Sequence, residues 1–304
     1  MAVQEAAAAP ATYDGWTLPR ETPRLVALGR LAQRNPLGVL GLVLVLVFVF
    51  LGVFGPFLAP EDPRAINTSA QLEGPSLDHP FGTNKLGQDV LSRVIAGARL
   101  SFLIGLSAVG IGFMAGALLG MVGGFYGRWL DYLIQRSAES WAAFPSIILY
   151  LAFIAAFGKG LRTIVLVIII SALFGGSRVL RAMTMVLKQS DFIEATRALG
   201  AGEVRILIRH VIPNLMPIVI VGASSVFGIA VLAEAALSFL GLGVKEGTPS
   251  WGIDLSGENL RFARFYPHLV VFPGIALSLV VLGFNLVGDT LRDILDPRLR
   301  GSLR

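Results

Sequence analysis

Between two long apolar stretches of this chain lies the polar segment DFIEATRALGAGEVRILIRHVIPN, residues 191–214. Its pattern predicts two short helices separated by a turn. The first covers Asp191–Leu199, and Gly200 follows it because glycine readily adopts the positive φ with which helices often end. In the second, apolar residues recur at i, i+3, i+4 and i+7 and share one face. They are Val204, Leu207, Ile208 and Val211. We expect a compact helix–turn–helix whose shape suits docking into a groove of a partner protein.

Composition places the chain in a lipid bilayer. Hydrophobic residues make up 54% of the chain and charged residues only 15%, whereas soluble globular proteins carry about 25% charged residues. The formal net charge of +5 could indicate nucleic-acid binding, but retention of Lys and Arg on the cytoplasmic side explains it without a nucleic-acid partner. Cysteine is absent, which excludes disulfides, thiolate metal sites and a cysteine nucleophile.

Six segments have roughly the twenty apolar residues that crossing a bilayer requires. They are residues 37–58, 100–124, 140–157, 161–176, 213–240 and 267–291. The expected fold is therefore an all-α polytopic membrane protein with six transmembrane helices. The remaining parts are a tail (1–36), an external loop with an amphipathic surface helix from Asp89 to Leu100 (59–99), a loop within the 100–291 core (190–212) and a second tail (292–304).

Basic residues predict the orientation of these spans. With the N-terminus inside, most of the 25 Lys and Arg residues fall on the cytoplasmic side, as the positive-inside rule requires. The reverse orientation would place the basic residues between Arg178 and Arg209 outside the cell. Both tails and the 190–212 loop are therefore expected in the cytoplasm.

Two features inside the spans invite interpretation. Four glycines at a spacing of four residues form a ridge on one helix face, which favours close packing of a second helix, in this subunit or in a partner. They are Gly112, Gly116, Gly120 and Gly124. Glu234 is the one carboxylate well inside an apolar stretch. Such a residue is costly in a membrane, and we expect it to form hydrogen bonds at a helix interface rather than to relay protons.

Catalytic and metal-binding patterns are missing from the sequence. His79, His210 and His268 do not have the spacing of metal ligands, and no H-E-x-x-H or G-x-S-x-G motif occurs. The Gly158–Gly160 stretch lacks the remaining residues of a phosphate-binding loop. We therefore expect no catalytic residue, no metal site and no nucleotide hydrolysis by this chain.

The 191–214 segment resembles the coupling loop of ABC importer permeases. Glu194, Ala195 and Gly200 fit the Glu-Ala-Ala…Gly pattern of that loop, Thr196 replaces its second Ala, and Ile212-Pro213 stands for its Leu-Pro. The resemblance covers about residues 35–300 and is closest to the dipeptide/oligopeptide subgroup, on the blocks 79–93, 210–214, 237–243, 248–252 and 284–298. Asn84 and Gln88 replace the Asp and Arg usual in the first of these blocks.

This resemblance implies a type I ABC importer permease fold of the "C" type, with a five-helix core and an extra N-terminal helix, in the inner membrane of a prokaryote. It implies a second permease, two cytoplasmic ATP-binding subunits and an extracytoplasmic solute-binding protein as partners. ATP and Mg would be used by the ATPase subunits, and this chain would bind no cofactor. The residues implied in ATPase coupling are Asp191, Glu194, Ala195, Arg197, Gly200 and Pro213.

Three classes of function compete for this sequence. An ATP-driven permease is favoured, with di- or oligopeptides as the expected substrate and oligosaccharides or nickel chelates as alternatives. A proton-coupled secondary transporter needs several ionisable groups inside the membrane, and only Glu234 is present. An intramembrane enzyme needs a catalytic set, which the sequence lacks.

Overall fold

Helices make up nearly all the regular structure in the computed structural model, which describes residues 35–245 and 247–295. From Leu37 onward the described residues belong to one unit. The predicted tails, 1–36 and 292–304, lie outside the described residues except at their inner ends. Helix α2 (Pro36–Leu58) is an uncharged run of 23 residues. At 1.5 Å per residue it measures about 34 Å, enough for a hydrocarbon core of about 30 Å.

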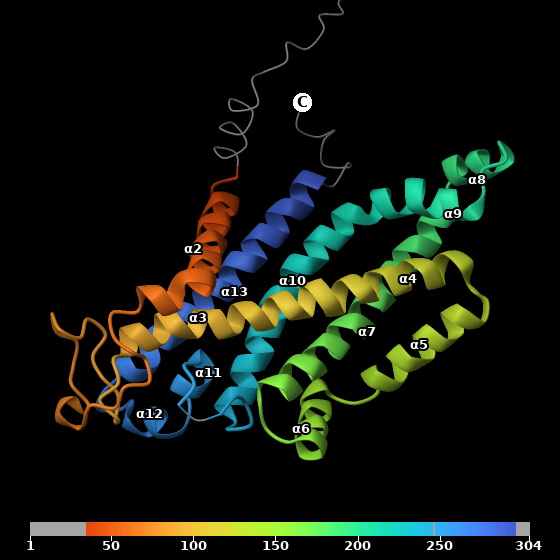
Figure 1. The fold of residues 1–304 in the computed structure, drawn as a ribbon. Helices are drawn as coiled ribbons and strands as arrows, with labels where there is room; N and C mark the ends of the chain where they lie inside the picture. The colour runs from red at the N-terminus through yellow and green to blue at the C-terminus, as the bar shows by residue number, and fades with distance from the viewer. Residues whose placement is uncertain (1–34, 246, 296–304) are drawn as a thin grey trace, which may run out of the picture. The chain divides into compact units, whose positions relative to one another are not determined.

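Five helical segments are long and apolar enough to cross a bilayer, and a bent pair of helices accounts for the sixth span (Figure 1). The chain is thus a polytopic α-helical membrane protein, with α2 preceding a core of five spans. After α2, the four single segments are α3–η2–α4 (Val90–Tyr126), α7 (Leu161–Lys188), α9–η3–α10 (Glu203–Phe239) and α13 (His268–Leu295).

Two helices expected to stand alone are instead the first turns of spans. Helix α3 (Val90–Ser107) includes the predicted surface helix and runs without interruption through the π-helical η2 (Ala108–Phe113) into α4 (Met114–Tyr126). The second helix of the 191–214 segment is likewise continuous with the span after it. Its parts are α9 (Glu203–Ile206), the π-helical η3 (Leu207–Val211) and α10 (Ile212–Phe239).

The third span differs most from its prediction. A single helix over residues 140–157 is wrong, because α5 (Arg128–Ala142) ends before Pro145 and α6 (Ser146–Phe157) begins after it. Proline lacks an N–H and disfavours helical geometry in the preceding residue. The two helices meet at 91°. Helix α6 measures only about 18 Å at 1.5 Å per residue and cannot cross a bilayer alone. The fourth span is also longer than expected, because α7 ends at Lys188 and not at Gly176.

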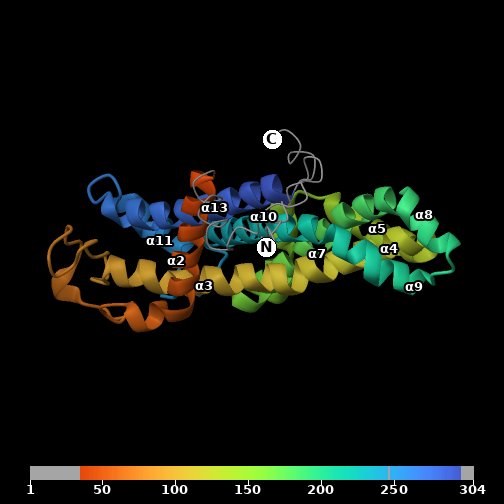
Figure 2. The same cartoon turned by 90° about the horizontal axis from the view of Figure 1, so that it is seen from above.

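The two ends of the core carry different connections, as Figures 1 and 2 show. Helix α8 (Asp191–Ala198) and α9 lie at one end, called here the α8 end. The opposite end, called the α11 end, carries α11 (Trp251–Asp254), α12 (Gly257–Phe262) and the 59–89 loop with the short helix η1 (Thr68–Ala70).

The glycine ridge of η2 and α4 faces α7 within this chain. A side chain added at any of the four glycines would collide with a backbone carbonyl of α7. Gly112 faces the carbonyl of Ile169, Gly116 that of Leu173, Gly120 that of Ser177 and Gly124 that of Arg181. Because these α7 residues are also spaced by four, the two backbones remain close over three turns. This packing fixes the end of α7, from which α8 departs.

Candidate functional site

Helix α8 has a defined start and a defined end. Asp191 and Glu194 lie in its first turn, where the positive end of the helix dipole stabilises carboxylates. It ends in a Schellman motif, in which the Gly200 N–H donates to the Arg197 carbonyl at 2.9 Å and the next N–H donates to the Thr196 carbonyl at 3.3 Å. Gly200 has a φ of +85°. A glycine is needed here for its backbone conformation, since an added side chain would meet no neighbour within 4 Å.

A single buried side chain attaches α8 to the core. Ile193 is 0% exposed and belongs to the apolar cluster formed with residues of α4, α7 and η3. The remaining surface of the helix faces outward, including Phe192, Glu194 and Ala195. Leu199, just after the helix, is 89% exposed. The helix therefore offers an apolar and acidic surface of its own at the tip of the molecule.

An ion pair closes the turn between α8 and α9. The Arg197 guanidinium donates from Nε to Glu203 Oε1 at 2.8 Å and from Nη2 to Oε2 at 3.3 Å. Both side chains are exposed, so the pair contributes at most about 1 kcal/mol to stability. Its bidentate geometry favours one angle between the two helices, which are positioned mainly by Ile193 and Ile206 in the shared apolar cluster. Sequence analysis singled out Arg197 but not its partner, although the two residues lie only six positions apart.

Polar contacts brace the platform from which α8 projects. Arg181 of α7 donates two hydrogen bonds to Asp131 of α5, at 2.5 and 2.7 Å. Lys188, the last residue of α7, donates to the carbonyl of Phe125 at the end of α4 at 2.5 Å. The ends of α4, α5 and α7 are thereby joined directly before α8 begins.

The apolar stripe predicted after Gly200 is only half correct. Leu207 and Val211 are buried, whereas Val204 and Ile208 are each 60% exposed. Val204 lies before the π-helical turn of η3 and Ile208 lies within it, and both are on the side of the helix that faces away from the apolar cluster. The position that completes the buried face is Ile206, at 0% exposure.

Pro213 lies in the first turn of α10, next to this π-helical turn. It has no N–H to donate to the carbonyl four residues earlier. The Asn214 side chain donates to the carbonyl of His210 at 2.6 Å, so a side-chain bond supports the backbone where the regular ladder is interrupted.

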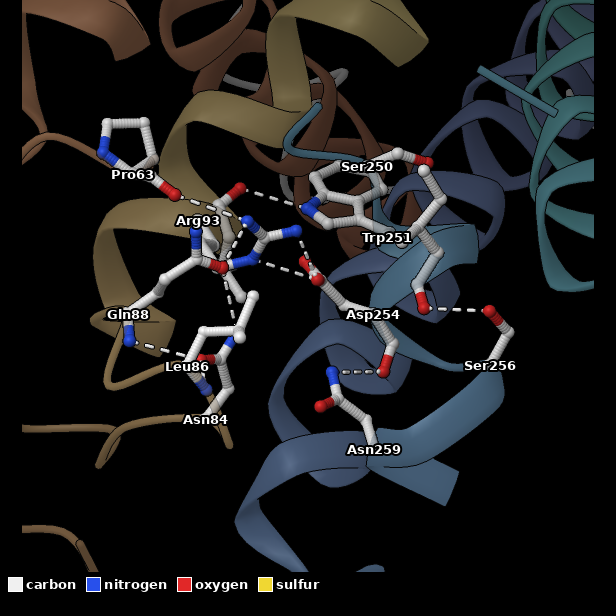
Figure 3. Close-up of polar contacts among 12 residues, drawn as sticks. Pro63, Asn84, Leu86, Gln88, Arg93, Ser250, Trp251, Asp254, Ser256 and Asn259 are labelled. Atoms are coloured by element: carbon white, nitrogen blue, oxygen red, sulfur yellow. Dashed lines mark hydrogen bonds and ion pairs between the residues drawn. The ribbon is translucent and has the colours of Figure 1, made fainter. Parts of the chain in front are cut away.

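A second group of polar residues, the Arg93 cluster, lies at the α11 end (Figure 3). Arg93 of α3 donates from Nε and Nη2 to Asp254 Oδ1 of α11, at 2.9 and 2.6 Å. Its Nη1 donates to Gln88 Oε1 at 2.9 Å and to the Pro63 carbonyl at 3.2 Å. Arg93 is 3% exposed and Asp254 is 4% exposed. Burial raises the pKa of the Asp254 carboxyl above its ordinary value, and the adjacent Arg93 guanidinium offsets only part of this rise.

The Arg93 cluster also explains the two residues that depart from the family pattern. Asn84 Nδ2 donates to Gln88 Oε1 at 2.9 Å, so a neutral hydrogen bond occupies the place where an Asp and an Arg are usual. Asn84 Oδ1 also accepts the backbone N–H groups of Leu86 and Gln88, at 2.9 and 3.0 Å. The Trp251 indole N–H donates to the Val94 carbonyl at 2.9 Å. The cluster thus joins the 59–89 loop, α3 and α11.

Glu234 of α10 is fully buried beside α11. Its Oε1 accepts hydrogen bonds from the hydroxyls of Ser238 at 2.8 Å and Ser250 at 2.9 Å. Ser250 directly precedes α11, so the carboxylate ties the end of α10 to that helix. Among the described residues, no three His, Asp or Glu side chains gather as a metal site would require.

Comparison with known proteins identifies the family. Residues 112–301 match the family described as "Binding-protein-dependent transport system inner membrane component", and residues 30–75 match the "N-terminal TM domain of oligopeptide transport permease C". Over 270 residues the chain is 40% identical to the dipeptide transport system permease protein of Alkalihalophilus pseudofirmus, covering 88% of each chain. It is 38% identical to the glutathione transport system permease protein of Escherichia coli O157:H7 over 270 residues, covering 88% of this chain and 89% of the relative. The chain therefore belongs to the binding-protein-dependent transport system inner membrane components, as a multi-span permease subunit of an ABC importer and not an enzyme.

Proposed function

We propose that this chain forms half of the translocation pathway of an importer for di- and oligopeptides, and that α8 couples it to the ATPase subunits. The similarity to permeases of dipeptide and glutathione systems supports the substrate class, because it extends over 88% of the chain. The match of residues 30–75 to an oligopeptide permease domain supports the same class.

The geometry of α8 supports the coupling role and is the observation that carries it. The helix is exposed except for the side chain that anchors it, and Arg197–Glu203 fixes it to α9. Helix α9 continues into α10, which ends beside α11. A displacement of α8 by an ATPase subunit would therefore act directly on the first turn of a long helix.

The proposed assembly follows from this placement. The α8 end and both termini face the cytoplasm, where two ATP-binding subunits use ATP and Mg²⁺, and this chain binds no cofactor. The α11 end faces the extracytoplasmic side and a solute-binding protein. A second permease completes the translocation pathway in the inner membrane.

The backbone at Gly200 provides a test of coupling. Gly200→Val forces a β-branched residue to a φ of +85°, which such residues rarely adopt. Gly202→Val is the matched control, because Gly202 has a φ of −68° and a ψ of 149°, and a side chain at either position meets no neighbour within 4 Å. In the reconstituted importer, Gly200→Val should lower ATP hydrolysis stimulated by the binding protein several-fold, and Gly202→Val should not. Membrane insertion should be equal in both. Normal transport by the Gly200→Val importer would contradict the coupling role.

Two further experiments separate the alternatives. A ligand screen on the purified solute-binding protein distinguishes peptides from oligosaccharides and nickel chelates, since that protein selects the substrate. A proton-coupled mechanism would require Glu234 to exchange protons, yet it is buried and accepts hydrogen bonds from two serine hydroxyls. Collapsing the proton gradient across proteoliposomes supplied with ATP should therefore leave uptake unchanged.

A further inference from the structure

At the α11 end, a cleft of about 500 Å³ lies between the loop that follows α2, one side of α3 and the segment directly before α11. Two exposed arginines line it, Arg64 from the loop and Arg99 from α3. Within residues 35–245 and 247–295, neither guanidinium has an ion-pair or hydrogen-bond partner. The cleft therefore presents two uncompensated cations.

The backbone that carries Arg64 is held in place by hydrogen bonds on both sides. The Glu61 N–H donates to the Ser92 hydroxyl at 3.0 Å, and the Arg64 N–H donates to Asp62 Oδ1 at 3.0 Å. The Arg64 carbonyl accepts from Gln88 Nε2 at 3.2 Å. The second arginine lies within a regular helix. Because both backbones are already positioned, an anion that binds the two side chains has a smaller entropic cost to overcome.

Apolar residues continue the cleft along α3, away from its charged part. Leu100 and Leu103 line it from α3, and Pro56 lines it from α2. Leu103 lies four residues beyond Arg99, so the two share one helix face, and it is 44% exposed. The cleft thus has a cationic part and an apolar part, arranged along the axis of a spanning helix.

The cleft lies where both neighbouring helices change from charged to apolar residues. The sequence carries no charged residue between positions 34 and 61, nor between positions 99 and 128. The two uncharged runs adjoin each other, since a side chain added at Gly55 of α2 would collide with the carbonyl of Ile95 of α3. Uncharged runs of this length are what a hydrocarbon core requires. The arginines therefore lie at its edge, next to the layer of lipid headgroups.

We propose that this cleft binds an anionic phospholipid, with Arg64 and Arg99 on its phosphate and an acyl chain along Leu103. Guanidinium groups bind phosphate oxygens through paired hydrogen bonds, and the stem of an arginine can lie along apolar surface. Asp62 also lines the cleft, so two arginines and one carboxylate leave a net charge of +1. This charge favours phosphatidylglycerol over zwitterionic lipids. The proposal does not depend on what the importer carries.

A lipid in this position would brace the α11 end. Pro63 lines the cleft, and its carbonyl accepts a hydrogen bond from Arg93 at 3.2 Å. Thr248 and Pro249 line it as well and directly precede Ser250, which binds Glu234. A phospholipid that contacts all three segments stabilises their arrangement by its binding free energy. Phosphatidylglycerol should therefore raise the unfolding temperature of the delipidated importer.

Native mass spectrometry of the complete, delipidated importer measures the affinity for added phosphatidylglycerol. Losing one charge-assisted hydrogen bond weakens binding about tenfold, so Arg64→Gln/Arg99→Gln should weaken the first bound lipid about a hundredfold. Arg162→Gln/Arg261→Gln is the matched control, because it removes two exposed arginines that do not line the cleft, and it should bind like the wild type. Equal affinity of the cleft variant and the wild type would overturn the proposal.

Further variants and ligands test the phosphate and the chain separately. Ala96→Phe places a ring in the cleft and keeps both arginines, so it should also lose the lipid, whereas Arg64→Lys/Arg99→Lys should restore part of the binding. Unfolding temperatures without lipid should be unchanged, because the arginines are exposed. Glycerol 3-phosphate and phosphatidylcholine should bind at least tenfold more weakly than phosphatidylglycerol.

Three results would assign the cleft to another occupant and overturn the proposal. Equal binding of glycerol 3-phosphate would indicate a site for a soluble anion. Equal binding of phosphatidylcholine would show that the two cations do not select the lipid. Loss of a partner subunit from Arg64→Gln/Arg99→Gln, with lipid binding retained, would indicate a protein interface.

Discussion

Gly116 is the position where the contact between α4 and α7 is most sensitive to a small change. A Cβ on Gly116 would overlap the Leu173 carbonyl oxygen and lie 2.7 Å from its carbon and 2.8 Å from its Cα. Ordinary contacts begin at 3.4 Å, so α7 would have to move by about 0.7 Å to clear the carbonyl carbon and farther to clear the closer oxygen. Gly112 and Gly120, about one turn away on either side, also lie against carbonyls of α7, and such a movement would disturb their contacts as well.

The expected cost of Gly116→Ala is therefore at the upper end of the range for overpacked cores, about 3 kcal/mol. Neither partner can adjust by changing a rotamer, because the colliding atoms belong to the backbone. Gly116→Leu should be more severe and should lower the yield of the complex. Since α7 belongs to this chain, the first effect should be on the stability of the subunit, and loss of its partners should follow from it.

Gly110→Ala provides the control in the same continuous helix. A Cβ at Gly110 meets no atom within 4 Å, so this variant should be as stable as the wild type. Thermal unfolding of the detergent-purified complex, followed by size-exclusion chromatography, measures both variants. Equal stability of Gly116→Ala and Gly110→Ala would refute the reasoning, because it would mean that the α4–α7 contact tolerates an added methyl group.

Two other predictions use the described contacts. Single cysteines at the exposed residues Gln189 and Lys245 should be labelled by an impermeant maleimide from opposite sides of the membrane, and labelling from one side would contradict the six-span topology. Arg93→Met should destabilise the chain by about 3–5 kcal/mol, because it leaves Asp254 buried without its partner. The double variant Arg93→Met/Asp254→Leu should recover much of this lost stability in thermal unfolding. A double variant less stable than Arg93→Met would show that the ion pair itself stabilises the fold.

The spans could be predicted because a membrane-spanning helix requires a run of about twenty consecutive apolar residues with few charges, and such a run is visible in the sequence itself. Helix breaks were predictable only where backbone chemistry imposes them, as at Gly200. Polar stretches did not show where a helix that starts in them would stop. Asp89–Leu100 and the residues after Gly202 were expected as separate helices, yet both continue into spans. The polarity of a residue indicates whether its side chain faces water or apolar surroundings. It does not indicate whether the backbone hydrogen bonds of the helix end there.

Contacts between distant segments could not be derived from one sequence. Arg93 and Asp254 are 161 positions apart; Arg93 ends the 79–93 block of the family resemblance, and Asp254 lies two residues after the 248–252 block. Nothing in either block specifies that the other is its neighbour. The exposed half of the apolar stripe has a different cause, because an apolar period identifies a helix face but does not show which residues of that face pack against the core, here Ile206, Leu207 and Val211.

The continuous helix from Glu203 to Phe239 relates the two ends of the molecule. Its 37 residues measure about 55 Å at 1.5 Å per residue, well beyond the thickness of a hydrocarbon core. Arg197 holds its first turn to α8, and Ser250 holds its Glu234 to the start of α11. A helix fixed at both ends transmits displacement unless it bends, and the π-helical turn beside Pro213 is where its regular hydrogen bonding is interrupted. In the proposed mechanism, movement of α8 therefore reaches the α11 end through α10, with any bending concentrated next to the coupling loop.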